Sequence, residues 1–397
     1  MRKSTLALVA VALLCSAVAP GAVKAEPQLE QIDLFEAGKG GYELYRIPGV
    51  VATSRGTLLA YCEARKSARA DWGHIDVVMR RSTDGGKTWS PQKQVVHLEG
   101  KFERNPAAVA QGLGKPGEIT INNPLAIVDE QQNVVHFLYC VEYNRLFHMT
   151  SSDDGETFSK PVELTPTIEQ FRPDYDWQSF AVGPGHGIQL KNGRLVVPVW
   201  LSTGKGGHAH RPSIVSTITS DDGGKTWQRG DIIAGEQRPL KNPSESIVVE
   251  LSDGRVLINL RSESPEHRRA FAISPDGRAN WTEPKFDDAL LEPVCMASIV
   301  RVVKPGGSES GKPAIVFANP STEKGRKNLS IKLSRDDAST WAATRVLEPG
   351  PSAYSDLAVG PDGTIYCFYE AGKRGAYERL TLAKFNLDWV AEKGETP

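Results

Sequence analysis

Two pairs of polar residues with identical spacing are the part of this chain best suited to chemistry. Glu245 and Arg261 lie 16 residues apart around a Ser-Asp-Gly turn, and Tyr354 and Glu370 lie 16 apart around a Pro-Asp-Gly turn. An arginine fork binds carboxylates through short, charge-assisted hydrogen bonds. A tyrosine hydroxyl, with an ordinary pKa of about 10, needs activation before it can act as a nucleophile. These residue types can therefore bind an anion and form a covalent bond to a substrate.

Both turns predict hairpins that would place these residues side by side. Each turn separates two apolar runs and leaves a loop of three residues. Residues equidistant from such a turn face each other across adjacent strands, with Cβ atoms about 5 Å apart. We therefore expect Glu245 beside Arg261 and Tyr354 beside Glu370, at equivalent ends of two hairpins. Matched positions of this kind favour convergence of the four side chains on a common axis.

Six turns of this type divide the chain at even intervals. Each separates two apolar runs rich in β-branched and aromatic residues, which is typical of β-hairpins. The turns are centred near Arg55, Gln131, Asn192, Asp253, Ser308 and Asp362. No long stretch after residue 25 shows the 3.6-residue apolar period of a helix.

A repeated octapeptide has the same period as the hairpins. The pattern S-x-D-x-G-x-T-[WF], hereafter the box, starts at residues 82, 151, 220, 274 and 334, with a mean period of 63 residues. The copy at 274–281 is degraded, and the copy at 334–341 has Ala338 in place of glycine. Its Ser and Asp can bond backbone N–H groups, its Gly accepts positive φ, and its aromatic residue packs under the turn.

The hairpins and the box together predict an all-β fold. Many strands, even spacing and one motif per unit favour a six-bladed β-propeller of four-stranded antiparallel blades. A parallel β-helix, the alternative repeat architecture, would have far shorter repeats. We expect one domain over residues 26–397, preceded by a signal peptide over residues 1–25. That segment has Arg2 and Lys3, then an apolar run and a small-residue cleavage site. The protein is expected to be secreted or periplasmic.

Charge, hydropathy and the spacing of histidines and cysteines limit the partners and cofactors that we expect the protein to bind. The formal charge is −1 for the whole chain and about −4 without the first 25 residues, which gives no support to nucleic-acid binding. No segment after residue 25 is long and apolar enough to cross a membrane. The histidines form no metal-ligand spacing, so neither a metal nor a cofactor is expected. Four cysteines remain after residue 25 and match no disulfide or zinc pattern, which favours buried thiols. These are Cys62, Cys140, Cys295 and Cys367.

Several motifs carry a specific family resemblance. They are Tyr45-Arg46-Ile47-Pro48, Glu63-Ala64-Arg65 running on to Asp71-Trp72-Gly73 and Ile75-Asp76, Gly183-Pro184-Gly185-His186-Gly187, Glu245 to Arg261, Asn319-Pro320 with Arg326-Lys327-Asn328-Leu329, and Tyr354-Ser355-Asp356-Leu357 with Glu370. With these motifs the chain resembles the exported bacterial exo-α-sialidases over essentially the whole length after residue 25. The box alone is much less specific, because other propellers carry it.

The resemblance implies an arginine triad of Arg46, Arg261 and Arg326. Sialic acid bears a carboxylate on its anomeric carbon, and guanidinium forks fix both the charge and the plane of such a group. The resemblance also implies that Glu370 holds the guanidinium of Arg46 in place.

The resemblance further implies roles for five other residues. Tyr354 would be the nucleophile, Glu245 the base that takes its proton, and Asp71 the general acid and later the base that activates water. We expect the nearby arginines to favour the phenolate of Tyr354. Glu63 and Arg65 are expected to contact ring hydroxyls of the sugar.

The expected activity is retaining hydrolysis of terminal sialic acid from glycoproteins, glycolipids or oligosaccharides. Two other readings stay open: an inactive box-propeller lectin, and a trans-sialidase or hydrolase of another nonulosonic acid. His186 could contact a ligand or only stabilise its glycine-rich turn. Asn122-Asn123-Pro124 occupies a place where several relatives have an Asp near the substrate, so the chain departs from the family there.

Overall fold

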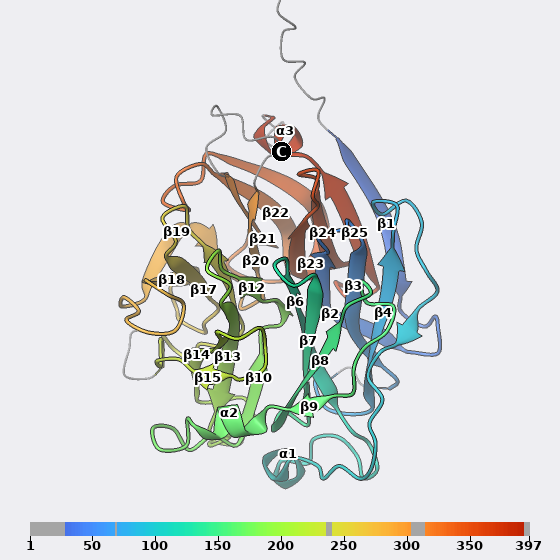
Figure 1. Ribbon diagram of the computed structural model, residues 1–397, viewed down its shortest axis with the longest axis vertical. Helices are drawn as coiled ribbons and strands as arrows, with labels where there is room; N and C mark the ends of the chain where they lie inside the picture. The colour runs from blue at the N-terminus through green and yellow to red at the C-terminus, as the bar shows by residue number, and fades with distance from the viewer. Residues whose placement is uncertain (1–27, 68–69, 236–239, 303–313, 393–397) are drawn as a thin grey trace, which may run out of the picture.

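The computed structural model describes residues 28–67, 70–235, 240–302 and 314–392 (Figure 1). These residues form 25 strands and three five-residue helices, so the all-β prediction is confirmed. The helices are α1 (Pro106–Ala110), α2 (Thr165–Glu169) and α3 (Leu387–Ala391). The expected signal peptide and the turn near Ser308 lie outside the described residues.

Four sheets follow one another along the chain. The first has the order β2 (Leu44–Ala52), β3 (Leu58–Arg65), β4 (Ile75–Ser82) and β5 (Lys93–Gln94). The second has the order β11 (Gly185–His186), β6 (Ile121–Asp129), β7 (Val134–Val141), β8 (Arg145–Ser151) and β9 (Val162–Glu163). The third has β10 (Ser179–Val182), β13 (Leu195–Ser202), β14 (Ser213–Ser220) and β15 (Gln228–Arg229), with β12 (Ile188–Gln189) also on β13. The fourth has β16 (Ser246–Glu250), β17 (Val256–Leu260), β18 (Arg268–Ser274) and β19 (Lys285–Leu291).

A fifth sheet of seven strands contains both ends of the described chain. Its order is β1 (Leu29–Glu36), β25 (Arg379–Phe385), β24 (Ile365–Ala371), β23 (Ala343–Val359), β22 (Lys327–Ser334), β21 (Ala314–Pro320) and β20 (Ser298–Val302). Strand β23 changes partner along its length. Its residues 343–351 pair with β22, whereas residues 352–359 pair with β24. The first strand, β1, pairs antiparallel with the last, β25.

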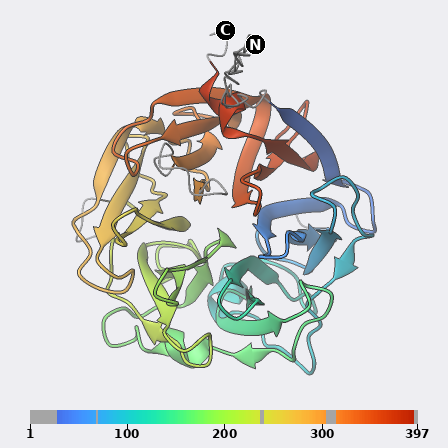
Figure 2. The ribbon, with the colours of Figure 1, turned by 45° about the horizontal axis from the view of Figure 1, so that its top comes forward.

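The sheets stand around a central axis, as Figure 2 shows. Contacts around the axis run from β2 to β6, on to β12, β16 and β20, then within the seven-stranded sheet from β20 to β23, and from β23 back to β2. Five of the predicted hairpins lie at the expected turns: β2–β3, β6–β7, β12–β13, β16–β17 and β23–β24. The radial arrangement brings strand ends from distant parts of the sequence to one place.

The box has the internal hydrogen bonds expected from its sequence. In the first copy Ser82 Oγ accepts from the N–H of Gly86 at 2.9 Å, and Asp84 Oδ1 accepts from the N–H of Thr88 at 2.9 Å. The indole of Trp89 donates to the carbonyl of Gly86 at 3.1 Å. Hydrogen bonds, first those from Thr88, lower the pKa of the Asp84 carboxyl to about 2. The box is therefore a self-capped turn between strands.

The copy with Ala338 contains a strained residue. Ala338 has φ 63°, and the glycine at the same place in the first copy, Gly86, has φ 87°. An L-residue in this left-handed region costs about 1–2 kcal/mol, whereas glycine adopts it freely but loses more entropy on folding. We therefore expect Ala338→Gly to raise the free energy of unfolding by about 0.5–1 kcal/mol. Urea unfolding measures this change, and Gly86→Ala should shift stability in the opposite direction. An unchanged or lower stability of Ala338→Gly would contradict the strain.

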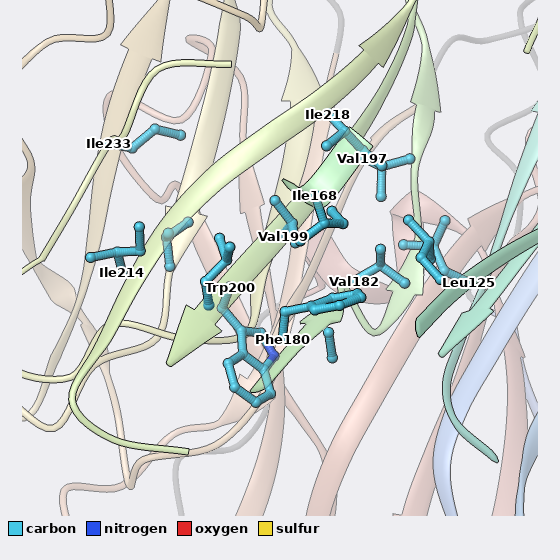
Figure 3. Close-up of a cluster of buried hydrophobic side chains, with 14 of the residues drawn as sticks. Leu125, Ile168, Phe180, Val182, Val197, Val199, Trp200, Ile214, Ile218 and Ile233 are labelled. Carbon is cyan, nitrogen blue, oxygen red and sulfur yellow. The ribbon is translucent and has the colours of Figure 1, made fainter. Parts of the chain in front are cut away.

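The core lies between the faces of neighbouring sheets. Figure 3 shows Phe180, Val199 and Trp200 packed in one such cluster beside Leu125 of the preceding sheet. Every residue of β13 is buried, because other structure covers both faces of that strand. All four cysteines of the described chain are free and buried, which confirms the prediction of buried thiols.

Candidate active site

One cavity gathers six residues that the sequence assigned to the site. They come from three of the sheets, two residues from each, and lie on strands or within a few residues of strand ends. The six are Arg46, Asp71, Glu245, Arg261, Arg326 and Tyr354. Because they span about 300 residues of sequence, only the radial arrangement of the sheets brings them together.

The hydroxyl of Tyr354 lies at the centre of this group. Its Oη is 2.7 Å from Oε1 and 2.6 Å from Oε2 of Glu245. Arg261 Nη1 donates to the same Oη at 2.7 Å and also bonds Glu245 Oε2. The backbone N–H of Arg261 donates to the carbonyl of Glu245 at 3.2 Å, as expected for paired hairpin ends. The phenol of Tyr354, the carboxylate of Glu245 and the guanidinium of Arg261 are thus in mutual contact.

The position of Tyr354 depends on the change of partner within β23. The register between β23 and β24 shifts between Ser352 and Ser355, so a bulge places Ala353 and Tyr354 opposite Glu370. The predicted neighbours are therefore adjacent, at the position where the regular register running from Val359 to Ser355 ends in the bulge. The backbone N–H of Tyr354 donates to Glu370 Oε2 at 3.0 Å, which leaves the phenol free to reach Glu245.

Burial decides the charge state of Tyr354. Desolvation is the largest influence and raises the pKa of the phenol, and the charge of Glu245 raises it further. The charges of Arg261, Arg326 and Arg46 lower the pKa, as expected, but the net direction is well above the ordinary value. The arginines therefore favour the phenolate, as expected, but desolvation together with the charge of Glu245 outweighs them in the unliganded protein. Tyr354 is a neutral phenol that needs a base.

Glu370 holds Arg46 and the backbone around it. Glu370 Oε1 accepts from Arg46 Nε at 2.8 Å and from the N–H of Ile47 at 3.1 Å, and its side chain is fully buried. Ile47 has φ 58° and lies where the register between β2 and β3 shifts. The strain of a β-branched residue in this region is concentrated beside the site. Glu370 thus has the buttressing geometry predicted for it.

Arg326 is the arginine that lacks a carboxylate partner. Its Nη1 donates to Tyr377 Oη at 3.0 Å and its Nη2 to the carbonyl of Val294 at 2.8 Å. No carboxylate of the described residues forms an ion pair with it. The guanidinium carbons of Arg46 and Arg326 lie 5.1 and 5.2 Å from the centre of the Tyr354 ring. A positive charge without a counter-ion therefore faces the cavity near the phenol.

Asp71 lies in the loop after β3 and is half exposed. Arg65 Nη2 donates to its Oδ1 at 3.2 Å, and Arg46 Nη1 lies 4.0 Å from the same oxygen. Desolvation raises the pKa of the Asp71 carboxyl, but the charges of Arg65 and Arg46 together outweigh it. The net pKa is well below the usual range. In the unliganded protein Asp71 is therefore ionised.

Glu63 and Arg65 lie behind Asp71, not at the cavity. Both side chains are fully buried, and Arg65 Nη2 donates to Glu63 Oε2 at 2.6 Å. Arg65 Nη1 donates to the carbonyl of Ala70 at 2.8 Å, and Glu63 Oε1 accepts from the N–H of Asn123. This placement differs from the expected contact with ring hydroxyls. The pair is arranged instead to hold the loop that carries Asp71.

Aromatic residues that the sequence did not single out also line the cavity. Tyr143, Trp200 and His210 lie together, with ring centres 4.7 Å apart for Tyr143 and His210 and 5.1 Å apart for Trp200 and His210. Burial lowers the pKa of His210 to about 4, so the ring is neutral. Tyr377, also missed, packs its ring 4.2 Å from the guanidinium carbon of Arg46. No repeated spacing links these residues, so the sequence offered no signal for them.

His186 lies outside this cavity. Its Nδ1 is 2.7 Å from Oδ1 of buried Asp356, which also accepts from the N–H of Val50 and the hydroxyl of Ser298. The structural reading of His186 is therefore favoured. Asn123, by contrast, lines the cavity at the place where the chain departs from the family pattern.

The described part of the chain shows neither a metal site nor a membrane-spanning helix. It holds no group of three or more His, Cys, Asp or Glu residues placed to bind a metal ion. None of its helices has the length and hydropathy needed to cross a membrane.

Sequence comparisons relate this chain to known proteins. A family model described as a BNR repeat-like domain matches residues 56–367. The chain is 31% identical to a sialidase of Micromonospora viridifaciens, covering 92% of this chain and 55% of that protein. It is 30% identical to sialidase-2 of Cricetulus griseus, covering 91% of this chain and 96% of that protein. The chain spans 55% and 62% of the lengths of two bacterial relatives, the second a sialidase of Bacteroides fragilis.

Solved structures show the same architecture. The Hadza microbial sialidase Hz136 superposes with a TM-score of 0.75 at 26% identity, covering 91% of this chain and 69% of that one. The intramolecular trans-sialidase from Ruminococcus gnavus superposes with a TM-score of 0.71 at 20% identity, covering 91% of this chain and 98% of that one. The boxes and the radial antiparallel sheets define a BNR-repeat β-propeller. Within that class, the chain belongs to the sialidase family.

Proposed function

We propose that this protein is a retaining exo-α-sialidase that hydrolyses terminal sialic acid from glycoproteins, glycolipids or oligosaccharides. The observation that carries the proposal is the contact of Tyr354 Oη with the Glu245 carboxylate, with Arg261 bonded to both. Arg46 and Arg326 flank the same ring. An anion-binding site beside a phenol in contact with a base is what cleavage of a sugar with an anomeric carboxylate requires.

The three arginines would bind the substrate carboxylate. Arg326 has no carboxylate partner in the described structure, and Nε of Arg261 is buried there without a hydrogen-bond acceptor. Arg46 is held in place by Glu370. Guanidinium groups that are already held in position bind a carboxylate without a further loss of side-chain conformational entropy.

Tyr354 would attack the anomeric carbon, and Glu245 would take the phenol proton as the bond forms. A neutral nucleophile suits this carbon, because an attacking carboxylate would meet the like charge of the substrate carboxylate. Burial keeps the phenol neutral until then, since the pKa of Tyr354 is raised. The product of this step is a glycosyl-tyrosine intermediate with the leaving group expelled.

Asp71 would donate a proton to the leaving oxygen and then remove one from the attacking water. Each step inverts the anomeric carbon, so the overall configuration is retained. Asp71 lines the cavity, and Arg65 with Glu63 supports its loop from behind. We assign Glu63 and Arg65 to this support.

We also propose that the propeller has six blades over residues 26–397. Strand β23 supports this count, because its first part completes β20–β22 and its second part completes β24, β25 and β1. The remaining four sheets would be one blade each. Export through a signal peptide at residues 1–25 is part of the same proposal, resting on the sequence pattern alone.

Turnover of a fluorogenic α-sialoside tests the proposed activity. Proton NMR during hydrolysis should show the α-anomer of free sialic acid as the first product. The β-anomer as first product would contradict the retaining mechanism. Binding of sialosides without turnover by the wild type would favour the lectin, and sialylated or anhydro products would favour transfer.

Replacing Arg261 with alanine tests the carboxylate site. We expect Arg261→Ala to weaken binding of a sialic acid analogue by about 2–5 kcal/mol, because the largely buried Glu245 loses its ion-pair partner and one fork is lost. Isothermal titration measures this loss, and Arg255→Ala on the exposed side of the same hairpin is the control. A loss confined to kcat, with unchanged affinity, would count against a carboxylate-binding role.

A further inference from the structure

A buried ion pair lies just outside the cavity, behind two of the three arginines. Arg269 Nη1 donates to Glu292 Oε1 at 2.9 Å, and the two side chains are 0% and 1% exposed. Arg269 belongs to β18, and Glu292 directly follows β19. Neither residue lines the cavity. Buried ion pairs add little net stability, because desolvation of both charges offsets their attraction. What this pair contacts therefore matters more than its own energy.

The pair holds the chain on both sides of Arg261. Arg269 Nε donates to Asn259 Oδ1 at 2.7 Å and Nη2 to the Asn259 carbonyl at 3.3 Å. Glu292 Oε2 accepts from the N–H of Ser262 at 3.2 Å. Asn259 and Ser262 flank Leu260 and Arg261 in sequence. The backbone that carries Arg261 past the end of β17 is thus anchored on either side by one buried unit.

The same pair holds the segment that binds Arg326. Arg269 Nη1 also donates to the carbonyl of Cys295 at 2.9 Å. The carbonyl of the preceding residue, Val294, accepts from Arg326 Nη2 at 2.8 Å. Val294 has φ 57°, which is strained for a β-branched residue and requires support from its surroundings. Glu292 and the Cys295 carbonyl, on either side of Val294, both bond Arg269.

The three arginines therefore have two different supports. Arg46 is bonded directly by buried Glu370. Arg261 bonds Glu245, and Arg326 bonds the Val294 carbonyl and Tyr377, so neither has a carboxylate devoted to support. We propose that Arg269 and Glu292 are positioning residues that set the relative placement of Arg261 and Arg326 for binding the substrate carboxylate. This inference rests on the proposed function, because it takes that carboxylate as the ligand.

Affinity for a carboxylate compared with its ester tests the proposal. The probes are the 2,3-dehydro analogue of sialic acid and its methyl ester, with Kd measured by isothermal titration. The wild type should prefer the acid. Because a displacement of about 1 Å can cost on the order of 100-fold, we expect Glu292→Gln to reduce the preference for the acid by about 10-fold or more. Affinity for the ester should change much less.

Two further variants separate positioning from stability. Arg269→Met combined with Glu292→Met removes both charges together, so no buried charge is left unpaired, and it should lose the same preference. Ile218→Val in the core of β14 lowers stability without touching the pair or the cavity, and should keep the wild-type preference.

The outcomes distinguish the inference from the proposed function. A wild type that hydrolyses sialosides, with folded pair variants that keep its preference for the acid, would overturn the positioning role alone. A wild type that shows no preference for the acid over the ester would overturn the carboxylate site itself, and the inference with it. Loss of preference in Ile218→Val as well would assign the effect to stability and overturn the proposal.

Discussion

Tyr354→Phe is expected to lower kcat on any α-sialoside by roughly 10⁴-fold or more, the scale of nucleophile removal in other hydrolases. The substitution deletes only Oη, the atom in contact with Glu245 and Arg261. Without it no glycosyl-tyrosine can form, whereas the arginines remain to bind the carboxylate. KM or the Kd of a sialic acid analogue should therefore change far less than kcat. Stopped or continuous fluorogenic assays measure the difference.

The matched control for this variant is Tyr61→Phe. Tyr61 is also fully buried, and its hydroxyl bonds the Gly185 carbonyl at 2.7 Å and the Ala126 N–H at 2.9 Å, outside the cavity. Losing that hydroxyl should lower the melting temperature while leaving kcat nearly unchanged. Equal activity of Tyr354→Phe and the wild type would exclude Tyr354 as the nucleophile. Mass spectrometry of the wild type with a fluorinated sialoside should locate the covalent adduct on the same residue.

Asp71→Asn is expected to lose more activity on substrates with poor leaving groups than on substrates with good ones. General acid catalysis contributes about 10²–10⁴-fold, so a natural sialoside with an alcohol leaving group should lose that much. An aryl sialoside with an acidic phenol needs little protonation, and its loss in the bond-cleaving step should be about 10-fold or less. Comparing kcat/KM over a series of phenols measures the difference. Equal losses across the series would contradict the acid role.

Substrate binding is expected to change the protonation of Asp71. In the unliganded protein the charges of Arg65 and Arg46 hold its pKa well below the usual range, so the required acid is ionised. A bound carboxylate near Arg46 adds negative charge, which favours the protonated form and raises that pKa. The alkaline limb of the pH profile of kcat reflects the substrate complex, and that of kcat/KM reflects the free protein. The limb of kcat should therefore lie at the higher pH. Identical limbs, or limbs unchanged in Asp71→Asn, would contradict this coupling.

Counting residues outward from the turn predicted the first pair of site residues, because pairing within a regular hairpin depends only on local geometry. Glu245 and Arg261 lie at the ends of a regular hairpin, and their backbone bond of 3.2 Å follows from the turn. Tyr354 and Glu370 are neighbours as predicted, but the bulge beside them was not predicted. A bulge shifts the register there, because β23 passes from pairing with β22 to pairing with β24. This change of partner depends on where β22 and β24 lie, so the residues of the turn give no indication of it.

The burial of a side chain is the property that its residue type predicts least. Glu63 and Arg65 were expected at the sugar, yet both are fully buried behind Asp71. The arginines around Tyr354 lower the pKa of its phenol, as expected, yet desolvation and the charge of Glu245 outweigh them. Both findings have one cause. Charges can be counted along a chain, whereas the water they lose depends on every element packed around them.

The sequence by itself determined the all-β class, the period of the hairpins, the internal bonding of the box and the residue types of the site. These depend on contacts within a few residues or across one turn, which local chemistry specifies. Only the tertiary structure decided that Glu63 and Arg65 are fully buried behind Asp71, that Tyr354 is neutral, and that Arg269 and Glu292 lie behind Arg261 and Arg326. Those features arise when the sheets assemble around one axis, because that step sets both the distances between remote residues and their exposure to water.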